Sequence, residues 1–540
     1  MSEPSASRRR LLQAGSALAI GGFAGSFNRR HPAVAATLDG NRVAARARVT
    51  RHAGSRPHPD RAVGTPDPSL PFDHIVIVMQ ENHSFDNYFG MLPVRGQPAA
   101  DGFRFDHFGR ALDVNPVQPG QPARGYIRSF RNDGPCQEDG ITQAWNATHH
   151  QIDGGRMDGF IATSGPPAMS YLDEPDIPFY YSLAKTFTLA NRWFCSAPCQ
   201  TYPNRRFLMA GTAYGLVSTD VGSILDPPPP NGTIWDRLSA AGLSWRNYFT
   251  DLPSTGIIAN TIERHPLNLA PLAQFHADCA AGTLPAVSLV DPDFNAGATV
   301  LGEAQSLPGV DDVAKALGPG LAGVLDFVRA QGASEENPDH VTFGEAFVHG
   351  VVQSVLHGPA WHRTLLVWTY DEHGGYYDHV PPPAAIVPDK IRPVLQPTDV
   401  QGNYDIYGPR VPAVVVSPYS RPHGVTNEVY DHTSILATIE AKWNLPALTA
   451  RDANANTLAG FLGSTPRLLR PPKLAAPADL VAGDLDCQRT QHPPVISSPT
   501  APFPAGHTAE AGKRATLPAP LSPLGAVTEA TTEVLGKLGF

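Results

Sequence analysis

Two segments of the sequence place oxygen-bearing side chains next to each other directly after an apolar run. Glu81 and Asn82 follow one such run, and Asp371 and Glu372 follow another. Adjacent carboxylates are costly unless a cation or water lies between them, and carboxylate and amide oxygens suit hard divalent cations. Solvated polar groups at a helix N-terminus would also explain the first segment, and an acidic loop the second. Taken together, the two segments predict one oxygen-rich cation site.

A hydroxyl and a guanidinium lie close in sequence in the run from Thr201 to Arg205. A metal can lower the pKa of a threonine hydroxyl so that it attacks phosphorus, and a guanidinium can hold two phosphate oxygens. Read alone, Thr-x-Pro-Asn-Arg is also typical of a turn that enters a helix. The run therefore predicts a nucleophile only in combination with the cation site.

Two neighbouring histidines, His149 and His150, precede a glycine-rich segment. An imidazole can bind phosphate or protonate a leaving alkoxide. Neighbours in sequence point in different directions on a helix or a strand, so the pair cannot easily face one site together. A structural role is the alternative for each ring.

Apolar runs of strand length must position these residues. Four such runs are Ile75–Met79, Ala286–Val290, Thr364–Thr369 and Val411–Val416, and a helix-like stretch, Val341–Leu356, precedes the third. Continuous apolar runs indicate strands buried on both faces, as in a parallel sheet covered by helices. Whether the second run joins the main sheet or an insertion stays open. The alternation of strands and helices predicts an α/β sandwich, in which ligands bind beyond the carboxyl ends of strands.

Composition and charge limit the class of protein. The 540 residues exceed what one hydrophobic core needs, so the chain forms one large α/β domain with insertions or two domains. The hydrophobic fraction of 42% and the charged fraction of 17% are typical of a globular protein. The formal net charge is −9 without a strongly basic patch, which argues against a nucleic-acid partner.

The N-terminal residues have the pattern of an export signal. The run Ser7–Leu12 contains a twin-arginine pattern, a weakly apolar stretch follows, and Ala33-Val34-Ala35 offers a cleavage site. A membrane anchor is the alternative, but the stretch is short and broken by Gly and Ser. We expect export by the twin-arginine machinery to the periplasm or the outside of the cell, and no stable membrane span in the mature chain.

Five cysteines are present: Cys136, Cys195, Cys199, Cys279 and Cys487. Outside the cytoplasm one or two disulfides are expected, with one thiol left over and the pairing open. The spacing of Cys195 and Cys199 also suggests zinc, but no matching Cys or His pair stands nearby.

The segments described above resemble the phosphoesterase family that includes bacterial and plant non-specific phospholipases C and related acid phosphatases. The resemblance runs from Phe72 to Leu462 and is carried by the blocks Glu81–Gly90 and Asp371–His379. It implies an alkaline phosphatase-like three-layer sandwich with a largely parallel central sheet and a capping insertion. It also implies one divalent metal ion. Oxygen-only ligands favour a hard cation such as Ca²⁺, Mg²⁺ or Mn²⁺, and Zn²⁺ is the alternative.

The same resemblance implies roles for individual residues. The metal ligands would be Glu81, Asn82, Thr201, Asp371 and Glu372. Thr201 would also be the nucleophile, with Arg205 and His149 or His150 as further catalytic residues, and the substrate-binding residues would be Asn204, His340 and His373.

The chain departs from the family pattern in two places. Asn337 stands where the family usually has a histidine in a His-Pro context, and His340 lies three residues on. The histidine that contacts phosphate or acts as a general acid in the family therefore has no counterpart at position 337. The C-terminal tail is also too short for the two small β domains of the large phospholipases C, so membrane engagement by such domains is not supported.

These observations predict an exported, metal-dependent phosphoester hydrolase that cleaves phospholipids in the manner of a phospholipase C. An acid phosphatase acting on small phosphomonoesters is the alternative, and a non-catalytic exported protein that binds metal and phosphate is the alternative of another class. The expected organisation is a signal peptide (1–35), a lead-in segment (36–70), a catalytic domain (71–465) with a cap at roughly 205–340, and a Pro/Ala-rich tail (466–540).

Overall fold

The computed structural model describes residues 48–132, 134, 140–294, 333–336, 340–478 and 493–503. The expected signal peptide lies outside the described residues, as do most of the C-terminal tail, Cys136 and Cys487. Cys195, Cys199 and Cys279 are described, and all three are buried free thiols.

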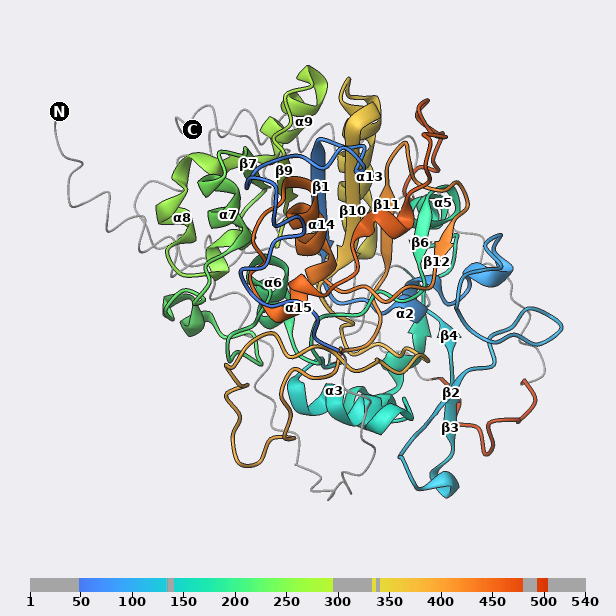
Figure 1. Cartoon of the computed structure of the whole chain (residues 1–540). Coiled ribbons are helices and arrows are strands. Elements are labelled where there is room, and N and C mark those ends of the chain that lie inside the picture. The colour runs from blue at the N-terminus through green and yellow to red at the C-terminus, as the bar shows by residue number, and fades with distance from the viewer. Residues whose placement is uncertain are drawn as a thin grey trace, which may run out of the picture.

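An eight-stranded sheet forms the centre of the molecule (Figure 1). Its strands lie in the order β12-β6-β11-β10-β1-β9-β7-β8. Strand β11 is antiparallel to both of its neighbours, and the other adjacent pairs are parallel. The expected α/β fold with a largely parallel sheet is therefore confirmed. The strands are β1 (His74–Gln80), β6 (Thr188–Ala190), β7 (Trp245–Phe249), β8 (Leu269–Pro271), β9 (Val287–Val290), β10 (Thr364–Tyr370), β11 (Ala413–Val416) and β12 (Val425–Thr426).

The two longest strands of this sheet, β1 and β10, lie side by side. They pair in parallel from His74 with Thr364 to Gln80 with Tyr370, so both end at the same edge of the sheet. Every residue of both strands is buried. This burial explains their continuous apolar sequence, because helices cover both faces of the sheet.

Two groups of helices make the outer layers of the sandwich. In one group α13 packs against α9 and α5, and in the other α14 packs against α6 and α15, with α7 beside α6. The first group is α5 (Pro178–Thr186), α9 (Leu272–Ala281) and α13 (Val341–His357). The second group is α6 (Thr201–Ala210), α7 (Ile234–Ala240), α14 (Thr433–Trp443) and α15 (Ala450–Ala453).

Shorter elements lie at the carboxyl end of the sheet and around its rim (Figure 1). The helices are α2 (Phe85–Phe89), α3 (Trp145–Ile152), α4 (Phe160–Ser164) and α8 (Thr261–Arg264). Two small strand pairs join β2 (Val114–Pro116) to β3 (Tyr126–Arg128) and β4 (Phe130–Arg131) to β5 (Ser170–Tyr171).

The apolar runs of the sequence all became strands of the main sheet. The run 286–290, whose place was open, is β9 and pairs directly with β1. Strands β7, β8 and β9 lie inside the range expected for a cap, 205–340, yet they extend the main sheet. This part of the range is therefore sheet rather than cap, because its strands continue the parallel pairing of β1. The limits of the domains stay a prediction.

A described part of the C-terminal tail contacts β3. Ile496 forms a bridge with Tyr126, and the Arg128 guanidinium donates to the Ala501 carbonyl at 2.7 Å, so part of the tail packs against β3. A search of the described residues for a helix of sufficient length and hydropathy to cross a membrane finds none.

Candidate active site

The two oxygen-rich segments meet at the carboxyl ends of β1 and β10. The Asp371 N–H donates to the Gln80 carbonyl at 3.0 Å, so Glu81 and Asp371 leave the sheet side by side. The side chains of Glu81, Asn82, Asp371 and Glu372 are at most 1% exposed. The structure thus brings together four of the residues expected to bind a metal.

Arg205 lies between the two segments. Its Nε donates to Oδ2 of Asp371 at 3.2 Å, and its Nη2 lies 3.4 Å from Oε1 of Glu81. The same Nη2 also donates to the carbonyls of Met79 and Gln80. The guanidinium is therefore an internal counter-charge for the carboxylates, whereas the sequence suggested that it binds phosphate oxygens.

Burial raises the pKa of each carboxyl group in this cluster. For Glu81 the neighbouring carboxylate of Glu336 adds to the rise and Arg205 opposes it, and for Glu372 the charge of Asp371 adds to the rise. Oε2 of Glu81 and Oε1 of Glu372 are buried without a hydrogen-bond partner. Unpartnered buried carboxylate oxygens beside like charges fit a divalent cation, which satisfies both the charge and the lone pairs.

Asn82 adopts a left-handed backbone conformation, with φ of 67°. Its Oδ1 accepts from Gln143 at 3.4 Å, and its Nδ2 is buried without a partner. Gly374 packs directly on it, because a Cβ at Gly374 would lie 2.1 Å from the Asn82 carbonyl oxygen. The glycine after Asp371 and Glu372 is thus what allows the two segments to approach each other.

Thr201 is the first residue of α6 and is 4% exposed. Arg205 lies one helical turn further along, so both side chains are on the helix face that meets the carboxylates. Cys199 and Tyr202, which flank Thr201, interact electrostatically with Glu372 and Glu81 respectively, and each carboxylate helps burial to raise the pKa of its neighbour. Together with the hydrogen bonds from Arg205 to Asp371 and Glu81, these interactions place the start of α6 beside the carboxylate cluster.

The loop that precedes Thr201 is shaped by Asn204. Its Nδ2 donates to the Cys199 carbonyl at 2.7 Å, and its Oδ1 accepts from the Ala197 N–H at 3.1 Å. Ser196 in the same loop donates to Asp431 at 2.8 Å. The amide of Asn204, expected to bind substrate, is occupied by the backbone that positions Thr201.

The histidines of α3 are placed differently from the expectation. The His149 ring bonds the Trp145 carbonyl through Nδ1 at 2.7 Å, and burial lowers its pKa to about 4. Among the described residues, no hydrogen bond or ion pair joins His149 or His150 to the carboxylate cluster. The next residue, Gln151, bonds the ring of His373 at 2.7 Å instead. Nothing in the sequence pointed to Gln151, because a glutamine is not a typical acid, base or metal ligand.

The two remaining histidines have distinct positions. Nδ1 of His373 lies 3.4 Å from Oε2 of Glu372, and burial lowers the pKa of His373 to about 3, so this ring is neutral beside the cluster. His340 caps α13, because its Nδ1 accepts from the Thr342 N–H at 3.3 Å.

A second group of ligand-type side chains consists of Asp86, Asp378 and His379, whose atoms lie within 4.8 Å of one another. Arg410 donates to Asp378 at 2.9 Å and to Asp86 at 3.1 Å. Burial lowers the pKa of His379, but the carboxylates of Asp86 and Asp101 outweigh it and raise that pKa to about 10. Two positive side chains thus already neutralise this group, and the cluster around Glu81 fits a cation better.

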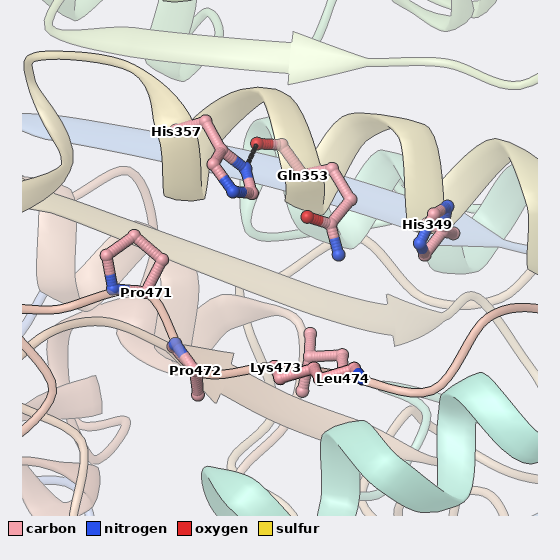
Figure 2. Close-up of a pocket in the computed structure, with 7 residues that line it drawn as sticks. All are labelled: His349, Gln353, His357, Pro471, Pro472, Lys473 and Leu474. Atoms are coloured by element: carbon pink, nitrogen blue, oxygen red, sulfur yellow. Dashed lines mark hydrogen bonds between the residues drawn. The ribbon is translucent and has the colours of Figure 1, made fainter.

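A surface pocket of about 450 Å³ lies between α13 and residues 471–474 (Figure 2). Side chains of α13 face a segment of the tail across it, and none of the predicted site residues lines it. Its lining residues are His349, Gln353, His357, Pro471, Pro472, Lys473 and Leu474.

Comparison with known proteins decides the family. Residues 72–446 match the Phosphoesterase family. The chain belongs to the phosphoesterase family. This phosphoesterase is 30% identical over 498 residues to a non-hemolytic phospholipase C of Burkholderia pseudomallei, with 85% of this chain and 68% of the relative covered. It is also 30% identical to the non-specific phospholipase C1 of Arabidopsis thaliana, with 75% of this chain and 74% of the relative covered.

Among solved structures, a protein in the alkaline phosphatase superfamily from Vibrio parahaemolyticus is similar to this chain, and the alignment covers 69% of this chain and 79% of that protein. The two are 11% identical, with a TM-score of 0.30. The resemblance expected from the sequence motifs is confirmed by the family match, and the phosphoesterase is a hydrolase acting on ester bonds.

Proposed function

We propose that this phosphoesterase is a metal-dependent phospholipase C that cleaves phospholipids through Thr201. The names of its relatives support the phospholipid substrate. The observation that supports the metal is the pair of buried, unpartnered carboxylate oxygens on Glu81 and Glu372. The side chains that would hold the ion are Glu81, Asn82, Thr201, Asp371 and Glu372.

The chemistry that a divalent ion supplies in such a site is polarisation of the phosphoryl group and a lower pKa of the attacking hydroxyl. An oxygen-only ligand set favours a hard cation such as Ca²⁺, Mg²⁺ or Mn²⁺, and Zn²⁺ remains in the set to be tested. The chain's own residues supply the rest. Arg205 keeps the carboxylates paired, and the loop held by Asn204 presents Thr201.

The reaction takes place in two displacements. The Thr201 oxygen attacks phosphorus and loses its proton, a Thr–O–P bond forms, and the bond from phosphorus to the glycerol oxygen breaks. Diacylglycerol leaves after its oxygen takes up a proton. Water then attacks phosphorus, which releases the phosphorylated head group and restores the threonine hydroxyl. Delivery of the proton by His149 or His150 stays a prediction.

An assay of a phosphatidylcholine analogue beside p-nitrophenyl phosphate tests this proposal. A phospholipase C prefers the lipid diester, and loss of the bound metal abolishes turnover. Preference for the monoester would assign the same site to an acid phosphatase. Unchanged turnover by Thr201→Ala would exclude the threonine mechanism.

We also propose that the protein is exported. The support is the twin-arginine pattern at Ser7–Leu12 followed by the small residues Ala33–Ala35. Replacement of Arg8 and Arg9 by Lys is expected to leave the protein in the cytoplasm, and cell fractionation measures its location. Unchanged export of this variant would contradict the assignment.

A further inference from the structure

Residues 333–336, which we call the strap, lie along the carboxyl end of β1. The Glu81 N–H donates to the Ser334 carbonyl at 2.9 Å, and Nε2 of Gln80 donates to the Ala333 carbonyl at 2.9 Å. The strap therefore runs beside Gln80 and Glu81, and Glu81 is the first of the proposed metal ligands.

Glu335 anchors the strap in the protein interior. Its fully buried carboxylate accepts from the hydroxyl of Tyr180 at 2.5 Å, from that of Tyr370 at 2.6 Å, and from that of Tyr88. These tyrosines come from α5, β10 and α2, so the anchor joins three separate elements. Gly344 of α13 makes room for it, because a Cβ at that position would lie 2.1 Å from Oε1 of Glu335.

The backbone of Glu335 is strained in support of this arrangement. Its φ of 71° lies in the left-handed region, which is costly for a side chain with a Cβ. Such a conformation persists only when the surroundings hold it, and here three hydroxyls do so. The position of the next residue is thus tightly determined.

That next residue, Glu336, lies against the cation site. Its side chain interacts with the carboxyl group of Glu81, and its N–H donates to Oγ of Ser334 at 3.3 Å. The guanidinium of Arg205 is already bonded to Asp371 and Glu81. Glu336 therefore adds a further carboxylate to a cluster with excess negative charge, an arrangement that a bound cation would stabilise.

We infer that Glu336 is an additional carboxylate of the cation site, and that Glu335 is the positioning residue that holds it there through Tyr88, Tyr180 and Tyr370. The inference rests on the proposed metal dependence and goes beyond it. Glu335 and Glu336 form an adjacent acidic pair, as Asp371 and Glu372 do, but Glu335 bonds the three tyrosines whereas Glu336 interacts with Glu81.

Direct cation titration of the purified protein tests the role of Glu336. Calorimetry with Ca²⁺, Mg²⁺, Mn²⁺ and Zn²⁺ first identifies the ion that the metal-free wild type binds. Glu336→Gln is expected to weaken the affinity for that ion by about tenfold or more. Glu428→Gln is the control, because it makes the same change at a carboxylate outside the acidic cluster, one that accepts from the hydroxyl of Tyr430. This control is expected to keep the wild-type affinity.

Two neighbouring tyrosines of α5 test the positioning role. Tyr180 and Tyr181 are both fully buried, but the hydroxyl of Tyr181 donates to the Leu172 carbonyl and not to Glu335. Tyr180→Phe is expected to weaken cation binding several-fold, and Tyr181→Phe to leave it unchanged. In a Glu336→Gln background Tyr180→Phe should have no further effect on affinity, because it acts through Glu336.

The outcomes separate this inference from the proposed function. If the wild type binds a cation and Glu336→Gln binds it equally well, the inference is wrong and the metal site stands. Equal loss of affinity by both tyrosine variants, or additive loss with Glu336→Gln, would overturn the positioning role. If the wild type binds none of the four ions, both the inference and the metal dependence are wrong.

Discussion

Arg205 on α6 and Asp371 after β10 form a buried ion pair, with Nε of the guanidinium 3.2 Å from Oδ2 of the carboxylate. The pair joins the helix that carries Thr201 to the sheet edge that carries the acidic cluster. One charged contact therefore couples the segment of the proposed nucleophile to the proposed cation site, and this coupling leads to the first prediction.

Arg205→Gln should destabilise the protein and weaken its cation site. Removal of the guanidinium leaves Glu81 and Asp371 buried without a counter-charge, which costs about 3 kcal/mol. Urea unfolding of the metal-free protein measures this loss, and saturating cation should restore part of it by supplying positive charge. Wild-type stability of the variant without cation would show that the pair contributes little.

Thr201→Ala should abolish phosphoester turnover and leave the fold intact. The side chain is at the first position of α6 and the helix cap is Gln200, so the cap is not removed. The expected loss in kcat is at least about a thousandfold, because the covalent route is closed. Thr201→Ser keeps a hydroxyl and should keep measurable turnover. Trapping of a phosphorylated residue in a quenched reaction, followed by peptide mapping, checks the position.

Gly374→Ala should disrupt the site by a steric clash with Asn82. The new Cβ would lie 2.1 Å from the Asn82 carbonyl oxygen, and φ at this glycine is 65°. Gly154→Ala is the matched control, since Gly154 has φ of 62° and open space around it. Both variants incur backbone strain of about 1 kcal/mol, and the clash should cost Gly374→Ala about 2 kcal/mol more. Equal unfolding free energies of the two variants would show that Gly374 is not needed for the close approach to Asn82.

His379 should make the stability of the fold depend on pH. Its pKa in the folded protein is about 10, against an ordinary value of 6.5, because Asp86 and Asp101 outweigh the opposing effect of burial. The raised pKa stabilises the fold fully below pH 6.5, and this contribution is lost as the pH rises through about 10. The difference in unfolding free energy between wild type and His379→Gln should therefore be largest below pH 6.5 and become smaller as the pH approaches about 10.

Urea unfolding at several pH values measures that difference. His362→Gln serves as the control, because the ring of His362 is exposed and bonds the Pro359 carbonyl at 3.0 Å. Its difference from wild type should not change with pH in the same way. A gap for His379→Gln that widens toward alkaline pH would show that His379 is not held protonated by Asp86.

Local patterns in the sequence were sufficient to predict four of the eight strands of the main sheet, and to predict that the two oxygen-rich segments follow two of them. Continuous apolar runs indicated buried strands, and the strands found at Thr364–Tyr370 and His74–Gln80 end beside each other as expected. The same patterns did not show that β11 is antiparallel, because burial on both faces looks alike in either direction. They also did not show that β9 pairs with β1.

The sequence by itself determined which oxygen-bearing residues follow the strands, because the carboxyl ends of parallel strands share one edge. Only the tertiary structure decided which loop side chains face that edge. The residue of α3 that bonds His373 is Gln151, and not His149 or His150. The tertiary structure also brought Glu336 close to Glu81. These contacts join residues far apart in the chain, and their geometry depends on how separate elements pack. No local spacing of residue types encodes that packing.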